Sequence, residues 1–201
     1  MNIVLASSSR YRAQLLQQLG IKAQIIAPNI DETPLANESP EVLAQRLANS
    51  KARAIAERLS PTVAGSPAII IGSDQVAWCA NQALSKPLSV EKAQTQLQLM
   101  SGKVAQFYTA ICVMNSATEE QFCTCVVTEV EFRDLTPAQI NNYIQRELPL
   151  DCAGSFKCEG LGIALFKRIT SDDPSALIGL PLIALTTGLE TCGYVVLNAQ
   201  R

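Results

Sequence analysis

An apolar run in the middle of the chain is followed by side chains that can do chemistry. Residues 68–71, Ala-Ile-Ile-Ile, precede Gly72-Ser73-Asp74-Gln75. We expect a buried strand that ends at Gly72-Ser73 and presents Asp74 at the rim of a sheet. A carboxylate at a rim can hold a metal ion or take a proton from water, whereas inside the strand it would carry only a desolvation cost. The simpler alternative is a turn aspartate that caps the following segment.

A second polar cluster precedes the first predicted helix. Ser7 opens a run of three serines, and Arg10 and Arg12 follow, between the apolar run 2–6 and a helical pattern. Free backbone N–H groups at the start of a helix, and the positive end of its dipole, favour an anion there. The hydroxyls and guanidiniums add donors, although the glycines and lysine of a Walker loop are absent. The alternative is a serine cap with solvated arginines.

Two lysines and a loop glutamate complete the set of charges. Lys51 lies on a predicted helix, Lys86 precedes a proline in a loop, and Glu32 lies in an acidic loop. Taken singly, each fits a solvated surface residue. Taken together with Arg12, the lysines suit a polyphosphate, while Glu32 and Asp74 suit a divalent cation with oxygen ligands, Mg²⁺ or Mn²⁺. Attack on a phosphoanhydride commonly uses this combination of positive charge and metal.

The composition limits the class of protein and the kind of chemistry. The chain has 201 residues, is 48% hydrophobic and 17% charged, and has a formal net charge of −2. These values indicate a globular protein without a broad surface for nucleic acid or membranes. Because histidine is absent, Ser-His-Asp and Cys-His catalysis and histidine-bound zinc are excluded. No apolar run approaches the roughly 18 residues of a membrane span.

The seven cysteines are expected to be reduced thiols in a cytoplasmic protein. Their number is odd, none forms a C-x-x-C pair, and no leading segment resembles a signal peptide. Cys123 and Cys125 alternate in a strand-like stretch and are therefore predicted to share one face of a sheet. A redox module built on these two thiols is the alternative.

Apolar periodicity predicts an α/β fold with a mixed sheet, because strand-like runs alternate with helical patterns. Residues 104–114 and 121–132 are expected to form two long strands that a polar turn joins into an antiparallel hairpin. Residues 39–41 and a capping box at 136–139 mark the starts of two helices. The remaining strands are expected at 2–6, 21–27 and 160–169 and within the region 68–79, and the helices at 10–19, 40–59, 89–100, 137–147 and from 180 onward. On the helix over 40–59, the side chains expected to face the core are those of Val42, Leu43, Leu47, Ala48 and Ala52.

Short segments in order along nearly the whole chain resemble the Maf family of nucleotide pyrophosphatases. Each segment is weak alone, and their number and order carry the resemblance. They are Leu5-Ala6-Ser7-Ser8-Ser9 with Arg12, Asp31-Glu32-Thr33-Pro34, Arg46-Leu47-Ala48 with Lys51-Ala52, Gly72-Ser73-Asp74-Gln75, Lys86-Pro87, Ala153-Gly154-Ser155-Phe156-Lys157 with Glu159-Gly160, and Gly179-Leu180-Pro181-Leu182.

The resemblance implies a fold and a reaction. The fold would be a mixed α/β domain akin to inosine-triphosphate pyrophosphatases, with an elongated twisted sheet and flanking helices. It would form a single Maf-like domain over residues 1–201, with the active-site cleft between two lobes. The reaction would be hydrolysis of a nucleoside triphosphate to the monophosphate and pyrophosphate with a divalent metal, which removes aberrant nucleotides before incorporation. The resemblance also implies a homodimer, and neither nucleic acid nor a membrane is expected as a partner.

Two positions resemble the branch of the family that acts on 7-methyl-GTP. They are Gln75 and Glu159, where the branch that acts on dTTP and UTP has Thr and Gln. A 7-methylguanine ring carries positive charge and offers N–H donors on its Watson–Crick edge. A carboxylate such as Glu159 accepts both donors in a charge-assisted pair worth about 1.5–3 kcal/mol. Tyr11 is expected to stack on the cationic base for roughly 0.5–2 kcal/mol, and packing on a neighbouring residue is the alternative.

The site implied by the resemblance has three parts besides its catalytic carboxylate. Asp74 would activate the attacking water, assisted by Lys51 and Lys86, which neutralise the triphosphate. The other members are the metal ligands Glu32 and Asp74, the phosphate ligands Ser7 and Arg12, and the base-selecting residues Tyr11, Gln75 and Glu159.

Three residues depart from the family pattern. Arg10 stands where proline is usual, and Tyr11 stands where the 7-methyl-GTP branch usually has tryptophan, so weaker stacking is expected. Ser50 stands where a glutamate usually precedes the helix lysine, which predicts lower metal affinity or lower activity. The alternatives are the dTTP and UTP activity of the same family, or a nucleotide-binding regulator of cell division and septum formation with weak catalysis.

Overall fold

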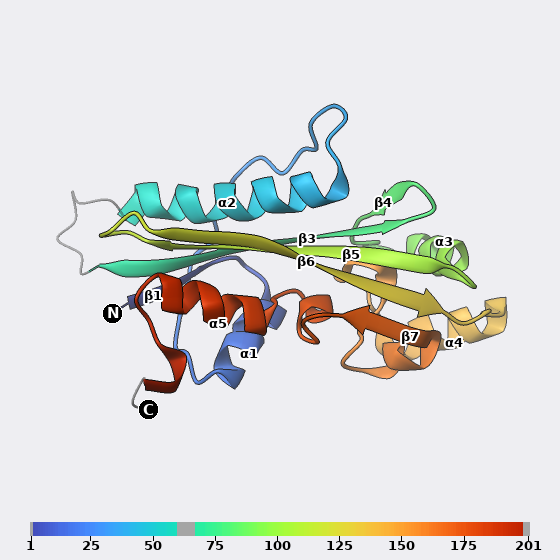
Figure 1. Cartoon of the computed structure of the whole chain (residues 1–201). Coiled ribbons are helices and arrows are strands. Elements are labelled where there is room, and N and C mark those ends of the chain that lie inside the picture. Colours follow the sequence, from blue (N-terminus) through green and yellow to red (C-terminus); the bar gives the residue numbers. More distant parts are fainter. Residues whose placement is uncertain (1, 60–66, 199–201) are drawn as a thin grey trace. The chain divides into compact units, whose positions relative to one another are not determined.

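The computed structural model describes residues 2–59 and 67–198, and Figure 1 shows their elements in chain order. The strands are β1 (Asn2–Ala6), β2 (Gln24–Ile25), β3 (Ala68–Cys79), β4 (Gln82–Leu84), β5 (Val104–Asn115), β6 (Gln121–Phe132) and β7 (Phe166–Ser171). The helices are α1 (Arg10–Gln18), α2 (Pro40–Leu59), α3 (Val90–Met100), α4 (Pro137–Glu147) and α5 (Leu182–Thr191). Short 3₁₀ helices are η1 (Ala153–Ser155), η2 (Leu161–Leu165), η3 (Ala176–Ile178) and η4 (Val196–Asn198). Within these residues, no helix combines the length and the apolar character needed to cross a membrane.

The sheet is mixed, as predicted. Its strand order is β2-β1-β3-β5-β6-β7, and β4 pairs with β3. β1 runs parallel to β2 and β3, whereas the pairs β3–β4 and β6–β7 are antiparallel. Residues 116–120 join β5 to β6, and the Asn115 N–H closes this turn by donating to the Glu120 carbonyl at 2.9 Å. Because so short a connection fits only antiparallel neighbours, the predicted hairpin is confirmed.

The chain divides into two compact units, each with its own hydrophobic core. Unit 1 comprises the described residues of Met1–Gln75, Thr109–Val126 and Asp173–Arg201. Unit 2 comprises Val76–Tyr108 and Val127–Asp172. The long strands β3, β5 and β6 therefore contribute residues to both units.

The core of unit 1 lies on one face of the β1–β3 pair. Ile3 and Leu5 on β1 alternate with the strand period, as do Ile69 and Ile71 on β3, and all four are buried in one cluster. This cluster also contains the helix residues Leu15, Leu16, Leu185 and Leu189. Figure 1 shows α1 and α5 on one side of these strands and α2 on the other. Because both faces are covered, the run 68–71 is apolar throughout rather than alternating.

The core of unit 2 is built around four phenylalanines. Phe107, Phe132, Phe156 and Phe166 meet edge to face, with ring centroids 4.9 to 5.8 Å apart. Edge-to-face contacts at this spacing are the favoured geometry for aromatic pairs. Helix α3 packs against α4 and η1 in the same unit.

The predicted helix boundaries are confirmed at several ends. Helix α1 stops before Gly20, which has a φ of 71° and so ends the helix in a left-handed conformation. Helix α2 starts at Pro40, and the Ser39 Oγ accepts from the Val42 N–H at 3.3 Å. Helix α4 opens with the predicted capping box between Thr136 and Gln139.

Two local predictions on unit 1 are wrong, one about the length of a strand and one about the burial of a side chain. Only Gln24–Ile25 pairs as a strand within the predicted stretch 21–27. Val42, expected to face inward, is 52% exposed. The buried stripe of α2 starts at Leu43, and Val42 lies about 100° around the helix from that residue.

The strand predicted over 160–169 begins later, at Phe166. Residues 161–165 form η2 instead. The backbone donors there are satisfied locally: the Gly160 and Gly162 N–H groups donate to the Lys157 carbonyl at 3.2 and 3.1 Å, and the Leu161 N–H donates to Glu147 Oε2 at 2.7 Å. A side chain at Gly162 would collide with the Lys157 backbone, so glycine permits this tight turn.

The expectation of seven reduced thiols is wrong for one pair of residues. Cys112 on β5 and Cys123 on β6 form a disulfide between neighbouring strands. The redox pair considered from sequence, Cys123 with Cys125, is therefore not the pair that forms. Cys125 is a free thiol, and burial raises its pKa to about 12, which makes it a poor nucleophile.

Candidate functional site

The parallel pairing of β1 with β3 brings Ser7, at the start of the serine and arginine cluster, close to Asp74 in the strand register. Ala6 pairs with Gly72, so Ser7, the first residue after β1, follows at the same level as Ser73 on β3. In parallel sheets, the region beyond the carboxyl ends of the strands is where ligands usually bind. The residues after β1 and the residues after Gly72 therefore form one polar region within unit 1.

Asp74 does not lie at the end of its strand, which corrects the sequence prediction. Strand β3 continues to Cys79, and Asp74 is 8% exposed. It lies instead just beyond Gly72, the last residue of β3 that pairs with β1. The desolvation cost expected for a carboxylate inside a strand is offset here by a partner with opposite charge.

That partner is Lys51, and Gly72 allows it to approach. A Cβ placed on Gly72 would collide with the Ala48 carbonyl oxygen and would lie 2.8 Å from the Ala52 nitrogen. Helix α2 therefore packs directly on the backbone of β3, through a glycine on one side and two alanines on the other. Lys51 lies between those alanines along the helix, so close packing carries its side chain toward Asp74.

Lys51 binds two carboxylates at once. Its Nζ lies 2.6 Å from Asp74 Oδ1 and 2.7 Å from Glu32 Oε1. The side chains of Lys51 and Asp74 are only 7% and 11% exposed, whereas Glu32 is 57% exposed. The structure thus brings together three of the predicted site residues around one buried ammonium group.

Arg12 is held at the same region of unit 1 by neutral oxygens. Its Nε donates to the Gly179 carbonyl at 2.8 Å, and its Nη1 donates to Ser7 Oγ at 3.3 Å. Burial lowers the pKa of the Arg12 guanidinium, and the nearby carboxylates of Asp74 and Glu32 act in the opposite direction. An arginine stays protonated in proteins, so this side chain is a fixed positive charge beside the carboxylate pair.

The two base-selecting candidates in unit 1 are both engaged with the protein. The Gln75 amide nitrogen donates to Thr109 Oγ1 at 2.9 Å and to the Ala176 carbonyl at 3.0 Å. Tyr11 accepts from the Arg10 guanidinium at 2.9 Å, and that guanidinium lies 4.9 Å from the centroid of the tyrosine ring. The Arg10 guanidinium therefore makes a cation–π contact with the Tyr11 ring. The partner predicted for this ring, a methylated base, is also a cation.

The remaining two predicted residues belong to unit 2. Lys86 is exposed in the segment after β4. Glu159 is exposed before η2, and its Oε2 accepts from the Cys158 thiol at 3.5 Å. Their roles in phosphate binding and base selection stay predictions.

The carboxylate pair fits a divalent cation only in part. Over residues 2–59 and 67–198, no three or more Cys, Asp or Glu side chains gather as a metal site. Asp74 and Glu32 each use one oxygen for Lys51 and keep a second oxygen, Oδ2 and Oε2, for a cation. Mg²⁺ is commonly held by one or two carboxylates together with substrate phosphates and water. The donor set therefore fits a cation whose coordination is completed by the substrate.

Sequence reasoning missed several residues that hold the site together. Ser73 Oγ donates to the Gly179 carbonyl at 3.2 Å, the same oxygen that accepts from Arg12. Thr109 Oγ1 donates to the Ala176 carbonyl at 3.0 Å and accepts from Gln75. Arg46 lay within a segment quoted for the family resemblance, yet it received no role. Five residues along a helix put Arg46 about 140° around the axis from Lys51, so helical spacing gave no signal for it.

Comparison with known proteins gives close relatives over nearly the full chain. The family described as "Maf-like protein" matches residues 2–192. A 7-methyl-GTP pyrophosphatase of Nitrosococcus oceani is 52% identical over 195 residues, covering 97% of this chain and 95% of that protein. Proteins with the same name from Paraburkholderia xenovorans and Cupriavidus pinatubonensis are 50% and 49% identical, covering 98% and 96% of this chain and 95% and 94% of their own length.

The Staphylococcus aureus Ham1 protein is 18% identical, with a TM-score of 0.40, over 67% of this chain and 73% of that chain. This likeness is too low to carry any argument about the site.

Proposed function

This chain belongs to the Maf family, and from that premise we propose that it hydrolyses 7-methyl-GTP to the nucleoside monophosphate and pyrophosphate. The relatives named for this activity are about half identical to the chain and cover almost all of it. The observation that carries the proposal is the buried Lys51, whose Nζ contacts both Asp74 and Glu32. The proposed biological role is the removal of modified nucleotides before they are incorporated.

Asp74 is proposed as the group that activates water. In the reaction, the water oxygen forms a bond to the α-phosphorus, and the bond from that phosphorus to the oxygen bridging it to the β-phosphorus breaks. Asp74 takes the proton that the water loses, and pyrophosphate leaves. Lys51 keeps the Asp74 carboxylate oriented, because its ammonium group binds Oδ1. The two lone pairs of Oδ2 are then available, one for the water and one for the proposed metal ion.

A divalent cation, Mg²⁺ or Mn²⁺, is proposed as the cofactor. When bound, it would supply positive charge to the phosphate oxygens and lower the pKa of a coordinated water. Asp74 Oδ2 and Glu32 Oε2 are the proposed ligands. Ser50 precedes Lys51 on α2 and supplies a hydroxyl rather than a third carboxylate, so the chain's own contribution to metal binding rests on this pair.

The triphosphate is proposed to be bound by Ser7 and Arg12, with Lys51 and Lys86 as further positive charges. The Ser7 hydroxyl oxygen accepts from the Ser9 N–H at 3.1 Å and from Arg12 at 3.3 Å. A hydroxyl has two acceptor lone pairs and one donor, so both acceptor positions are filled. Its hydrogen remains to donate to a phosphate oxygen.

The base is proposed to be selected by Tyr11, Gln75 and Glu159. The bonds of Gln75 engage its amide nitrogen, so its amide oxygen is the atom proposed to meet the base. An oxygen acceptor matches the N–H donors of the guanine edge, and a carboxylate at 159 adds a second acceptor with negative charge. The positive charge of a 7-methylated ring favours both that carboxylate and the face of Tyr11.

We also propose that residues 1–201 act as one Maf-like domain, that the protein is a homodimer, and that it works in the cytoplasm. The last point rests on the location of the nucleotide pool. Neither nucleic acid nor a membrane is proposed as a partner.

A nucleotide panel tests the function. Purified protein is given Mg²⁺ or Mn²⁺ and each of 7-methyl-GTP, GTP, dTTP and UTP, and pyrophosphate and monophosphate are measured. The proposal predicts fastest turnover of 7-methyl-GTP. Faster turnover of dTTP and UTP would assign the chain to the other branch, and tight nucleotide binding without turnover would favour a regulator.

A further inference from the structure

Glu32 lies on a segment without regular secondary structure, which we call the strap, residues 26–39. Three cationic side chains of α2 contact it. Arg58 Nη1 donates to the Ala27 carbonyl at 2.7 Å, Lys51 contacts Glu32, and Arg46 contacts Glu38. Because the helix numbers fall as the strap numbers rise, the strap runs antiparallel to α2. The one exposed carboxylate at Lys51 is therefore placed by a loop that α2 holds at several points.

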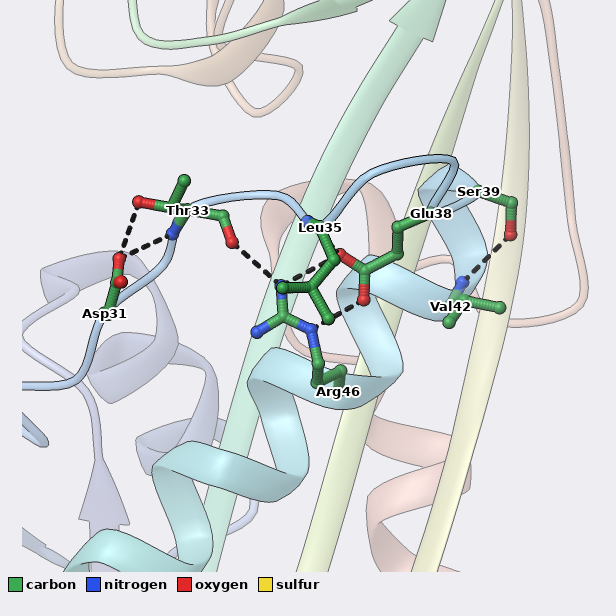
Figure 2. A network of polar contacts seen from close by, with 7 residues as sticks. All are labelled: Asp31, Thr33, Leu35, Glu38, Ser39, Val42 and Arg46. Atoms are coloured by element: carbon green, nitrogen blue, oxygen red, sulfur yellow. Dashed lines mark hydrogen bonds and ion pairs between the residues drawn. The ribbon is translucent and has the colours of Figure 1, made fainter.

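Arg46 makes the most extensive of these contacts (Figure 2). Its Nε donates to Glu38 Oε1 at 2.6 Å, and its Nη2 donates to Glu38 Oε2 at 2.8 Å. Such a two-point pair fixes the relative orientation of both groups as well as their distance. The same Nη2 donates to the Thr33 carbonyl at 3.0 Å, so Arg46 is also hydrogen-bonded to the backbone of the residue after Glu32.

The strap is fixed on the other side of Glu32 as well. Asp31 Oδ1 accepts from the Thr33 N–H at 2.9 Å and from the Thr33 hydroxyl at 2.6 Å, which closes a tight turn around residue 32. Glu38 Oε2 accepts from the Leu35 N–H at 3.0 Å. Figure 2 shows these contacts as one network that starts at Asp31 and ends on α2. The backbone on both sides of Glu32 is thus tied to the helix that carries Lys51.

We propose that Arg46, through its paired contact with Glu38 and its bond to the Thr33 carbonyl, is a positioning residue that holds Glu32 at Lys51. The inference rests on the proposed pyrophosphatase function, because it assigns Glu32 a part in that site. It adds a residue to the site that does not touch the reacting atoms.

The contacts of Arg46 argue against a direct role in phosphate binding. Its Nε and Nη2 are both committed to the strap, and its charge is matched by Glu38, whose side chain is only 4% exposed. The hydrogen bonds from Arg46 lower the pKa of Glu38 to about 2, so Glu38 stays ionised at any pH at which enzymes work. The pair is therefore a constant structural contact rather than a charge available to a substrate.

A double-mutant cycle on the full-length protein tests the positioning role. The variants are Arg46→Ala, Glu32→Gln and the two combined, with Arg53→Ala as the matched control. Arg53 lies on the same helix, is exposed, and contacts Asn49 at 3.0 Å. We expect Arg46→Ala to lower kcat/KM for 7-methyl-GTP by about 10–100-fold, the usual loss when a group that orients a metal ligand is removed.

The combined variant decides between the two roles. If Arg46 acts through Glu32, adding Arg46→Ala to Glu32→Gln lowers kcat/KM by less than about twofold, because residues that act as a unit are not additive. If the two losses multiply instead, Arg46 contributes independently and the inference is overturned. Arg53→Ala is expected to keep wild-type kcat/KM.

Hydrogen exchange supplies a readout that does not depend on activity. Backbone amides over 31–38 are expected to exchange faster in Arg46→Ala and in Glu38→Gln, and at the wild-type rate in Arg53→Ala. Unchanged exchange in both Arg46→Ala and Glu38→Gln overturns the inference even if the enzyme is active. Faster exchange in a protein that turns over no nucleotide would support the role of Arg46 in holding the strap and would reject the proposed function. Glu38→Gln preserves side-chain shape and so serves if Arg46→Ala does not fold.

Discussion

Asp74 and Glu32 lie at nearly the same distance from Lys51 Nζ, 2.6 and 2.7 Å, but they are held by different means. Asp74 is buried within a strand, and the close approach of α2 to Gly72 sets its distance from Lys51. Glu32 is exposed on the strap, and its position depends on the bonds that its neighbour Thr33 makes with Arg46 and Asp31. The buried side of the site is therefore fixed by backbone packing, and the exposed side by hydrogen bonds.

Because of this difference, variants on the two sides of the site should differ in how far they change the free energy of unfolding as well as the activity. A buried charge that loses its partner costs several kcal/mol, whereas an exposed ion pair is worth about 0–1 kcal/mol. Changes on the Asp74 side should therefore alter folding and activity together. Changes on the Glu32 side should alter activity with little effect on folding.

The largest effect is expected for Lys51→Met, which removes the ammonium group and keeps a side chain of similar length. Asp74 then stays buried without its cation, which should lower the free energy of unfolding by about 3–5 kcal/mol. The urea midpoint measures this change. Lys22→Met, at an exposed lysine of unit 1, is the control and should leave the midpoint unchanged. A Lys51→Met midpoint equal to wild type would show that Asp74 does not depend on Lys51.

Gly72→Ala should follow in size. The new Cβ collides with the Ala48 carbonyl, so α2 must move away from β3, and overpacking of this kind costs about 1–3 kcal/mol. Because the shift carries Lys51 away from Asp74, turnover of 7-methyl-GTP should fall in the same variant. Thermal unfolding and pyrophosphate release measure the two effects. Lost stability with full activity would disconnect the helix approach from the site.

Glu32→Gln should change stability by less than about 1 kcal/mol, because Glu32 is 57% exposed. Its kcat/KM should fall at least about tenfold, since even the removal of an outer partner of a metal ligand costs that much. Urea unfolding and steady-state kinetics, run side by side with Lys51→Met, compare the two sides of the site. A loss of stability equal to that of Lys51→Met would erase the distinction.

The smallest expected effect is the pH dependence of the stability that the Arg46–Glu38 pair contributes. The pKa of Glu38 falls from an ordinary 4.5 to about 2 in the folded protein, mainly through the hydrogen bonds from Arg46. A lowered carboxyl pKa contributes stability that is complete above pH 4.5 and is lost as the pH falls through about 2. The stability difference between wild type and Glu38→Gln should therefore be constant from pH 6 to 8 and shrink between pH 4.5 and 2. Acid titration followed by circular dichroism measures it, and a difference that grows toward low pH would contradict the assigned cause.

The same division explains what the sequence could predict. The continuous apolar run 68–71 and the helical period of residues 40–59 predicted the strand and the helix. The roles of Asp74 and Lys51 were predicted from their residue types and from the resemblance to the Maf family. Their direct ion pair follows from packing of small residues at Gly72, a contact between segments far apart in the chain. Asp74 was misplaced at a strand end because nothing after Gly72 shows that β3 continues while β1 stops.

The polar contacts were harder to predict. The Gly179 and Thr33 carbonyls accept from Arg12 and Arg46, but every residue has a carbonyl, so no side-chain type marks these two. The Arg46–Glu38 pair spans eight positions across a loop and a helix start, outside the regular spacing of a helix. Residues 160–165 looked like a strand by composition, and the local bonds to Lys157 and Glu147 turned them into η2.

The most direct measurement is pyrophosphate release from 7-methyl-GTP by Asp74→Asn, with nucleotide affinity determined on the same preparation. Asparagine keeps the shape of the side chain but cannot serve as a base, so kcat should fall by about 100-fold or more while the nucleotide still binds. Turnover near the wild-type rate would contradict the account, because the carboxylate next to Lys51 would then be dispensable for the chemistry.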